Sequence, residues 1–151
     1  MTRAPEGGPY EWWQRAVELL ERGDPAAAAV LLERTVAAEA RSASGWEALG
    51  RASYDAGQIQ RAAEAFTKLV ELAPDSHYGH FALGLSLTRL DRFERGVEHL
   101  AMASTMRPER PEYADRLRQA RATLQARQDA AAARAQDGAS NPGDRPDGTD
   151  G

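Results

Sequence analysis

Two histidines, His77 and His80, have the spacing closest to a metal-binding arrangement in this sequence. Side chains three residues apart on a helix share a face, so two such imidazoles can hold one metal ion. No carboxylate lies at the spacing that would complete such a site, and His80 falls where aromatic residues recur along the chain. We therefore predict structural roles for both, and a surface position without a special role for His99.

The sequence lacks the motifs by which most enzyme sites are recognised. It contains no cysteine, which excludes a thiolate nucleophile and a thiolate metal site. It has no phosphate-binding glycine loop, no dinucleotide glycine fingerprint and no G-x-S-x-G elbow. No triad, ligand set or carboxylate pair gathers in one place. We predict a protein that is not an enzyme and has no cofactor or metal of its own.

The composition bounds the partners and the compartment. A formal net charge of -4 over 151 residues leaves no basic face for nucleic acid. No apolar run approaches the length that spans a membrane, and the N-terminal stretch MTRAPEGGPY lacks the apolar core of a secretion signal. We expect a soluble, cytoplasmic protein that binds neither nucleic acid nor membrane.

A period of 34 residues organises the chain. Such self-similarity indicates a repeat architecture. Within each unit, apolar residues at three- and four-residue spacing predict two helices joined by a tight turn. The matching positions are Trp12, Trp46 and His80; Leu49-Gly50 and Leu83-Gly84; Ala28, Ala62 and Gly96; Leu32, Phe66 and Leu100; and Ala40, Pro74 and Pro108.

The glycines inside the predicted helices have a packing explanation. Gly50 and Gly84 each cost about 1 kcal/mol relative to alanine in a helix interior. Their presence predicts that a neighbouring helix crosses there too closely for a side chain. Beyond Pro108, the apolar spacing predicts one more helix, with an apolar face and an arginine-rich face, that covers the open end of the array.

These residues resemble the tetratricopeptide repeat (TPR), a family of 34-residue helix-turn-helix units. In order, the family's unit carries an aromatic residue, Leu-Gly, a small residue, an aromatic or leucine, and a proline. The second repeat matches best, and the third has His80 where tryptophan is usual. The resemblance covers about residues 9–108 and the helix after them. It implies an all-α fold, an α-solenoid of three TPR-like repeats in a right-handed superhelix with a capping helix.

The expected domain organisation follows from this resemblance. A flexible N-terminus at 1–8 precedes a TPR domain at 9–135, with repeats at about 9–42, 43–76 and 77–110. The capping helix is expected at about 111–135. Residues 136–151 have no large apolar side chain and four aspartates against one arginine, which predicts a disordered acidic tail.

In TPR arrays, the first helices of successive repeats line a concave groove. If Trp12 points inward, adjacent Trp13 cannot share its face and is expected to be exposed. The same one-residue offset predicts an apolar, aromatic groove. Glu47 and Arg51 lie four residues apart within it, and we interpret them as a helix-surface ion pair, with a role in fixing the ligand's register as the alternative. For the aliphatic members, packing on a neighbouring helix is an open alternative. The predicted binding residues are Tyr10, Trp13, Val17, Leu20, Glu47, Arg51, Tyr54, Tyr78, Phe81, Leu85 and Thr88.

This groove predicts a protein-interaction adaptor that receives an apolar or amphipathic peptide or helix of another protein. The family's carboxylate clamp for chaperone tails is not expected, because its slots lack the required lysine, arginine and asparagine. One alternative is a self-associating structural module, a homodimer formed through an exposed stripe at the first helix. Another is an accessory subunit of an enzyme complex. The clamp slots correspond to Trp13, Val17, Ala48, Tyr78 and Ala82, and the stripe to Trp13, Val17 and Leu20.

Overall fold

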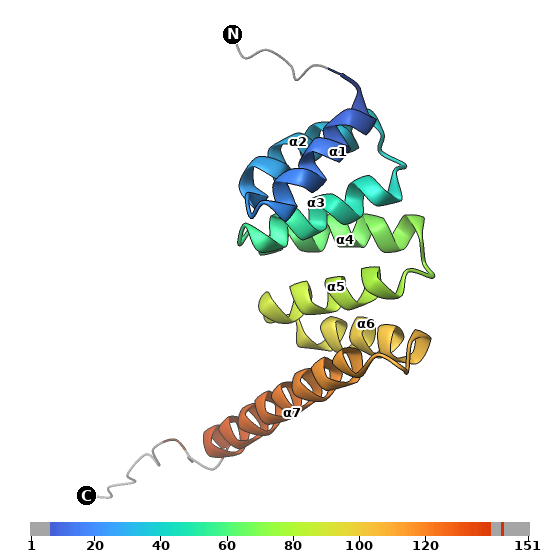
Figure 1. Cartoon of the computed structure of the whole chain (residues 1–151). Coiled ribbons are helices and arrows are strands. Elements are labelled where there is room, and N and C mark those ends of the chain that lie inside the picture. The colour runs from blue at the N-terminus through green and yellow to red at the C-terminus, as the bar shows by residue number, and fades with distance from the viewer. Residues whose placement is uncertain (1–6, 140–142, 144–151) are drawn as a thin grey trace, which may run out of the picture.

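The structure, a computed structural model, describes residues 7–139 and Gly143. That part of the chain contains helices and no strands, stacked as three helix hairpins followed by a longer helix (Figure 1). The predicted all-α solenoid is therefore confirmed. None of these helices is both long and apolar enough to cross a membrane. The helices are α1 (Pro9–Glu21), α2 (Pro25–Ala38), α3 (Ala43–Asp55), α4 (Ile59–Leu72), α5 (His77–Arg89), α6 (Phe93–Met106) and α7 (Pro111–Ala139).

Each hairpin turns at a residue with a left-handed backbone. Gly23 and Gly57 both have a φ of 80°, and Asp91, at the same position of the third repeat, has a φ of 62°. Glycine adopts this region freely because it has no Cβ. Asp91 adopts it as well, and its Oδ1 accepts a hydrogen bond of 3.0 Å from Arg127 Nη2 on α7. The third turn is thus tied to the last helix.

The links between repeats use the same cap twice. Ser42 Oγ accepts a hydrogen bond of 3.1 Å from the backbone N–H of Gly45. Ser76 Oγ accepts the equivalent bond from Gly79 at 2.9 Å. Both serines satisfy a backbone donor that the first turn of a helix leaves unpaired. The 34-residue period therefore extends to individual hydrogen bonds.

The predicted close crossings are confirmed at both helical glycines. A Cβ on Gly50 would lie 2.5 Å from Phe66 Cε1. A Cβ on Gly84 would lie 2.7 Å from Leu100 Cγ and 3.0 Å from the carbonyl oxygen of Gly96. Carbon atoms in favourable contact stay about 3.5–4.0 Å apart. The second helix of each of these repeats therefore packs directly on the backbone of the first.

The first helices of the repeats are not evenly spaced. α1 contacts α3, and α5 contacts α7, whereas the contact between α3 and α5 is smaller than either. Each second helix fills the space between its own first helix and the next one. This uneven spacing leaves room for a hollow between α3 and α5.

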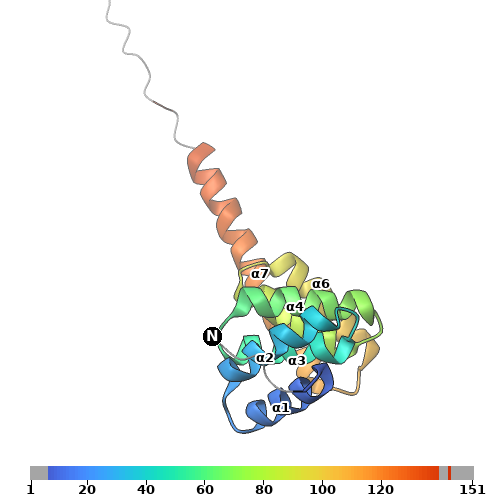
Figure 2. The ribbon, with the colours of Figure 1, turned by 90° about the horizontal axis from the view of Figure 1, so that it is seen from above.

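The last helix has a docked part and a projecting part. Its beginning packs on α6 and α5, where Tyr113, Leu117 and Ala120 are buried. From Gln125 to Ala139 every residue is exposed; Arg127 still contacts Asp91 and Phe93, and beyond it the helix stands clear of the other helices (Figure 2). Residues 136–139, expected to belong to the tail, continue the helix. The expected flexibility of residues 1–6 and disorder of residues beyond Ala139 lie outside the described residues, apart from Gly143.

Candidate functional site

A hollow of about 300 Å³ opens between α3 and α5, and we call it the α3–α5 hollow. Five of the residues predicted for the groove meet here, and they come from two different repeats. Sequence reasoning missed three further members, Asp55, Phe66 and Ala82. The lining residues are Arg51, Tyr54 and Asp55 from α3, Phe66 from α4, and Tyr78, Phe81, Ala82 and Leu85 from α5.

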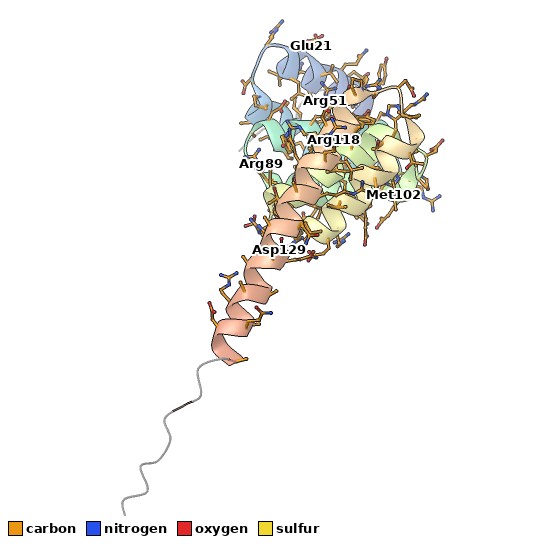
Figure 3. All side chains as sticks on the ribbon, turned by 90° about the horizontal axis from the view of Figure 1, so that it is seen from below. Glu21, Arg51, Arg89, Met102, Arg118 and Asp129 are labelled. Atoms are coloured by element: carbon orange, nitrogen blue, oxygen red, sulfur yellow. The ribbon has the colours of Figure 1, made fainter. Side chains whose placement is uncertain are left out.

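Ring contacts hold the aromatic side chains of the hollow in place. Tyr78 meets Phe66 edge-on, with ring centroids 6.2 Å apart. The guanidinium of Arg89 lies 5.1 Å from the ring centroid of Tyr54, within the range of a cation–π contact. Figure 3 shows Arg89 on the opposite side of the molecule from Met102 of α6. Because these rings are already ordered, a ligand that enters loses little free energy in arranging them.

The polar groups of the hollow lack hydrogen-bond and ion-pair partners among the described residues. The Tyr78 hydroxyl makes no hydrogen bond there, and neither Arg51 nor Asp55 makes an ion pair. Burial raises the pKa of Tyr78 to about 12, so its hydroxyl remains a donor at neutral pH. Among the described residues, Glu47 and Arg51 do not form an ion pair, so the interpretation of these two side chains as a helix-surface ion pair was wrong. These groups are free to bond to a ligand.

Tyr10 and Trp13 lie apart from this hollow, beside a second one of about 280 Å³ at the start of α1. Tyr10 is 65% exposed, and its ring stacks on Trp13 with centroids 6.3 Å apart. Trp13 Nε1 donates a hydrogen bond of 3.2 Å to the carbonyl oxygen of Ser44, and its ring packs against the core. Trp13 is thus half-buried rather than freely exposed, because the start of α3 lies against it.

The remaining predicted residues are scattered around these two hollows. Val17 and Leu20 are partly buried on α1, and Leu20 packs against the core. Glu47 is partly buried on α3. Thr88 lies with Leu85 beside a third hollow, of about 160 Å³, between α5 and α7. The predicted residues therefore occupy neighbouring places along the first helices rather than one unbroken line.

The start of α7 packs against side chains of the α3–α5 hollow, and sequence reasoning did not predict this contribution to the site. The ring of Tyr113, only 1% exposed, stacks on Phe81 with centroids 4.4 Å apart. Leu117 belongs to the apolar cluster against which Phe81 and Leu85 pack. The available signal was the period itself, because Leu117 follows Leu83 by one repeat length. The start of α7 thus takes the place of the first helix of a fourth repeat.

The histidines pair with other protein groups. His77 Nδ1 lies 2.8 Å from the Tyr113 hydroxyl, and His80 Nε2 lies 2.8 Å from the carbonyl oxygen of Pro74. His80 Nδ1 lies 3.0 Å from His99 Nδ1. His99 is therefore half-buried against His80, and the prediction of a plain surface position for it was wrong. Within the described residues, no group of three or more His, Cys, Asp or Glu side chains could hold a metal ion.

Sequence comparison finds repeats of the same kind. A family model described as tetratricopeptide repeat matches residues 14–77 and, in an overlapping match, residues 47–114. Superkiller complex protein 3 of Homo sapiens is 28% identical over 93 residues, which make up 62% of this chain. The chain spans only 6% of the length of that protein and of the Mus musculus protein of the same name.

Solved structures share the architecture. MamA from Desulfovibrio magneticus RS-1, from residue 41 to its end, has a TM-score of 0.76 at 18% identity, covering 91% of this chain and 80% of that one. The type III secretion chaperone SycD of Yersinia enterocolitica, in complex with a peptide of the translocator YopD, has a TM-score of 0.64 at 14% identity, covering 78% and 89%. With the helix hairpins in register and the family matches spanning residues 14–114, the chain belongs to the tetratricopeptide repeat family.

Proposed function

We propose that this protein is an interaction module that binds an apolar or amphipathic segment of another protein, with the α3–α5 hollow as the anchoring point. The observation that carries the proposal is an ordered aromatic hollow whose polar groups have no internal partner among the described residues. A ligand that supplies an apolar side chain buries the rings of the hollow. The same ligand can pair with Arg51, Asp55 and the Tyr78 hydroxyl, so that their desolvation is compensated.

The size of the hollow suits side chains rather than a whole helix. About 300 Å³ is at the lower end of the range for pockets that enclose small ligands. One or two bulky side chains of the partner would enter it, and the rest of the segment would lie across α3 toward α1. Along that path it would pass Glu47, Val17 and Leu20 and reach Trp13 and Tyr10. Leu85 and Thr88 would bound the other end, beside α7.

A free carboxylate is a poor candidate for the anchor. The hollow contains one guanidinium, from Arg51, and one carboxylate, from Asp55, so its charges balance. The positions that form the carboxylate clamp in the family are apolar or aromatic in this sequence. A carboxylate held there would meet the guanidinium of Arg51 but also the negative charge of Asp55, so the cation would not offset its loss of water. The preferred segment is therefore apolar at its anchor and mixed in charge beside it.

The solved complex of SycD with a peptide of YopD supports a peptide as the occupant, because it pairs a similar fold with such a ligand. The proposal includes no catalysis and no cofactor.

Self-association through Trp13, Val17 and Leu20 is less favoured, because Trp13 and Leu20 are already packed against the core. Sedimentation of the isolated chain at micromolar concentration tests this alternative, and a monomer argues against it. An accessory subunit of an enzyme complex would use the same hollow.

Peptides selected from a random display library provide the test. Their affinities would be measured by fluorescence polarisation for the wild-type chain, for Leu85→Ala and for Val30→Ala. Leu85 lines the hollow, whereas Val30 is 62% exposed on α2, away from it. Both changes shorten an aliphatic side chain, so each controls for the other.

We expect Leu85→Ala to weaken binding at least tenfold, about 1.4 kcal/mol, and Val30→Ala to leave it within twofold. Helical circular dichroism would establish that both variants are folded. Equal affinities for wild type and Leu85→Ala, or a failure of the library to yield any ligand, would contradict the proposed anchoring point.

A further inference from the structure

The third repeat carries a histidine pair where the second repeat has no titratable side chain. In repeat two, Trp46 Nε1 donates a hydrogen bond of 2.7 Å to the carbonyl oxygen of Ala40. One repeat length later, His80 Nε2 lies 2.8 Å from the carbonyl oxygen of Pro74. His80 thus preserves the N–H group of the tryptophan. Its second nitrogen, which tryptophan lacks, meets His99.

The carbonyl of Pro74 determines where the hydrogens of this pair lie. A carbonyl oxygen only accepts, so His80 Nε2 must carry a hydrogen, and Nδ1 of the neutral ring is then an acceptor. His99 Nδ1, 3.0 Å from it, must therefore donate. The two rings are nearly parallel, with centroids 5.3 Å apart and planes at 18°, and they meet through these nitrogens. One hydrogen, and no more than one, fits between the two nitrogens.

The surroundings of the pair disfavour additional positive charge. His80 is buried and His99 is half-buried. Burial lowers the pKa of His99, His80 and Arg95 lower it further, and Glu98 opposes them. Arg95 and Glu98 both belong to α6. No charged side chain of the described parts of α4 or α7 shifts the pKa of His99.

We propose that this histidine pair makes the packing of α5 on α6 sensitive to acid. A proton added to His99 places a positive charge on a half-buried ring that lies 3.0 Å from His80 Nδ1 and near Arg95. Water stabilises that charge better than this position does, so acid favours states in which His99 is released to solvent. The pair opens, and with it the contact between the two helices.

The direction of the pH effect follows from proton binding. A histidine in the unfolded chain takes up its proton near pH 6.5. The lowered pKa of His99 means that the unfolded chain binds more protons than the folded chain just below that pH. The stability that the pair contributes is therefore complete above about pH 6.5 and is lost as the pH falls through the lowered value.

Opening of the pair would reach the proposed binding site through α5. Tyr78, Phe81 and Leu85 line the α3–α5 hollow from this helix, and His80 lies between the first two in sequence. Acid would thus loosen one wall of the hollow. This consequence for binding rests on the proposed function, whereas the acid-sensitive packing does not.

Repeat two provides a matched control for the pair. The double substitution His80→Trp/His99→Ala copies its Trp46 and buried Ala65, one repeat length earlier. Thermal unfolding of this variant and of the wild type would be followed at pH 7.5 and pH 5.0. His77 is present in both chains, so its contribution cancels. We expect the melting temperature of the wild type to fall by about 4 °C more than that of the variant. Equal decreases would overturn the proposal.

A second measurement uses the wild type alone and holds even if the variant does not fold. Long-range ¹H–¹⁵N NMR of the imidazoles should show, at pH 7.5, a hydrogen on His80 Nε2 and none belonging to its Nδ1. On acidification, the protection factors of amides in α5 and α6, which correct for the slower intrinsic exchange in acid, should fall before those in α3 and α4. A hydrogen on His80 Nδ1 at neutral pH, or uniform exchange in acid, would refute the inference. Neither experiment needs a partner, so its failure is distinct from failure of the proposed function.

Discussion

Replacing Gly84 with alanine tests whether α5 and α6 cross at backbone contact. The new Cβ would lie 2.7 Å from Leu100 Cγ and 3.0 Å from the carbonyl oxygen of Gly96. Leu100 is completely buried and the carbonyl belongs to a helix, so neither can yield unless α6 shifts. Overpacking against backbone costs about 3 kcal/mol, and the helix propensity of alanine offsets about 1 kcal/mol of this. We expect the free energy of unfolding to fall by about 2 kcal/mol.

Urea unfolding followed by circular dichroism at 222 nm measures this change. With a slope near 2 kcal/mol per molar, the midpoint for Gly84→Ala should fall by about 1 M. Gly138→Ala is the matched control, because a Cβ at that exposed position of α7 meets no atom within 4 Å. It should leave the midpoint unchanged or raise it slightly. A Gly84→Ala midpoint at or above that of the wild type would show that the two helices do not touch there.

Three further predictions concern stability and titration. Ser53→Ala should raise the free energy of unfolding by about 1 kcal/mol, because the buried Ser53 hydroxyl has no hydrogen-bond partner among the described residues; a lower urea midpoint would contradict this. Gly57→Ala should lower it by about 1 kcal/mol although the space around is open, because its φ of 80° strains a side chain; an unchanged melting temperature would count against that explanation. Tyrosine absorbance at 295 nm should show a last ionisation near pH 12 that disappears in Tyr78→Phe, and complete ionisation by pH 11 would refute it. Because that pKa is raised by burial, the stability tied to Tyr78 should be complete below about pH 10 and lost as the pH rises toward 12.

The repeat fold could be predicted partly because glycine destabilises the interior of a helix, so its recurrence there indicates a packing requirement. Gly50 and Gly84 recur at one repeat length and lose stability unless a neighbour needs the space. That argument predicted a close helix crossing at both glycines, and the structure has one at each, through Phe66 and Leu100. The end of α7 could not be predicted as well, because an alanine-rich stretch with nothing to pack against carries no periodic signal.

For the candidate site, the sequence predicted which side of its helix a residue faces, but it did not predict how close the neighbouring helices lie. The spacing of a single helix indicates which side a residue faces, and this brought Tyr54, Tyr78 and Leu85 together. It does not indicate how near the next helix lies. Trp13 is half-buried because α1 and α3 touch, whereas the hollow exists because α3 and α5 approach each other less closely. The contact of His99 with His80 likewise depends on the separation of two helices.

The projecting part of α7 has a consequence for how heat unfolds this chain. The stretch from Gln125 to Ala139 extends about 22 Å and is exposed throughout, and Arg127 near its start contacts Asp91 and Phe93. A helix of about 12–15 residues is marginal in water by itself, so this arm depends on the docked half of α7 for its nucleus. On heating it should fray residue by residue, well below the temperature at which the repeats melt together. Ellipticity should then decline along a slope before the main transition, and the van't Hoff enthalpy taken from it should fall below the calorimetric enthalpy.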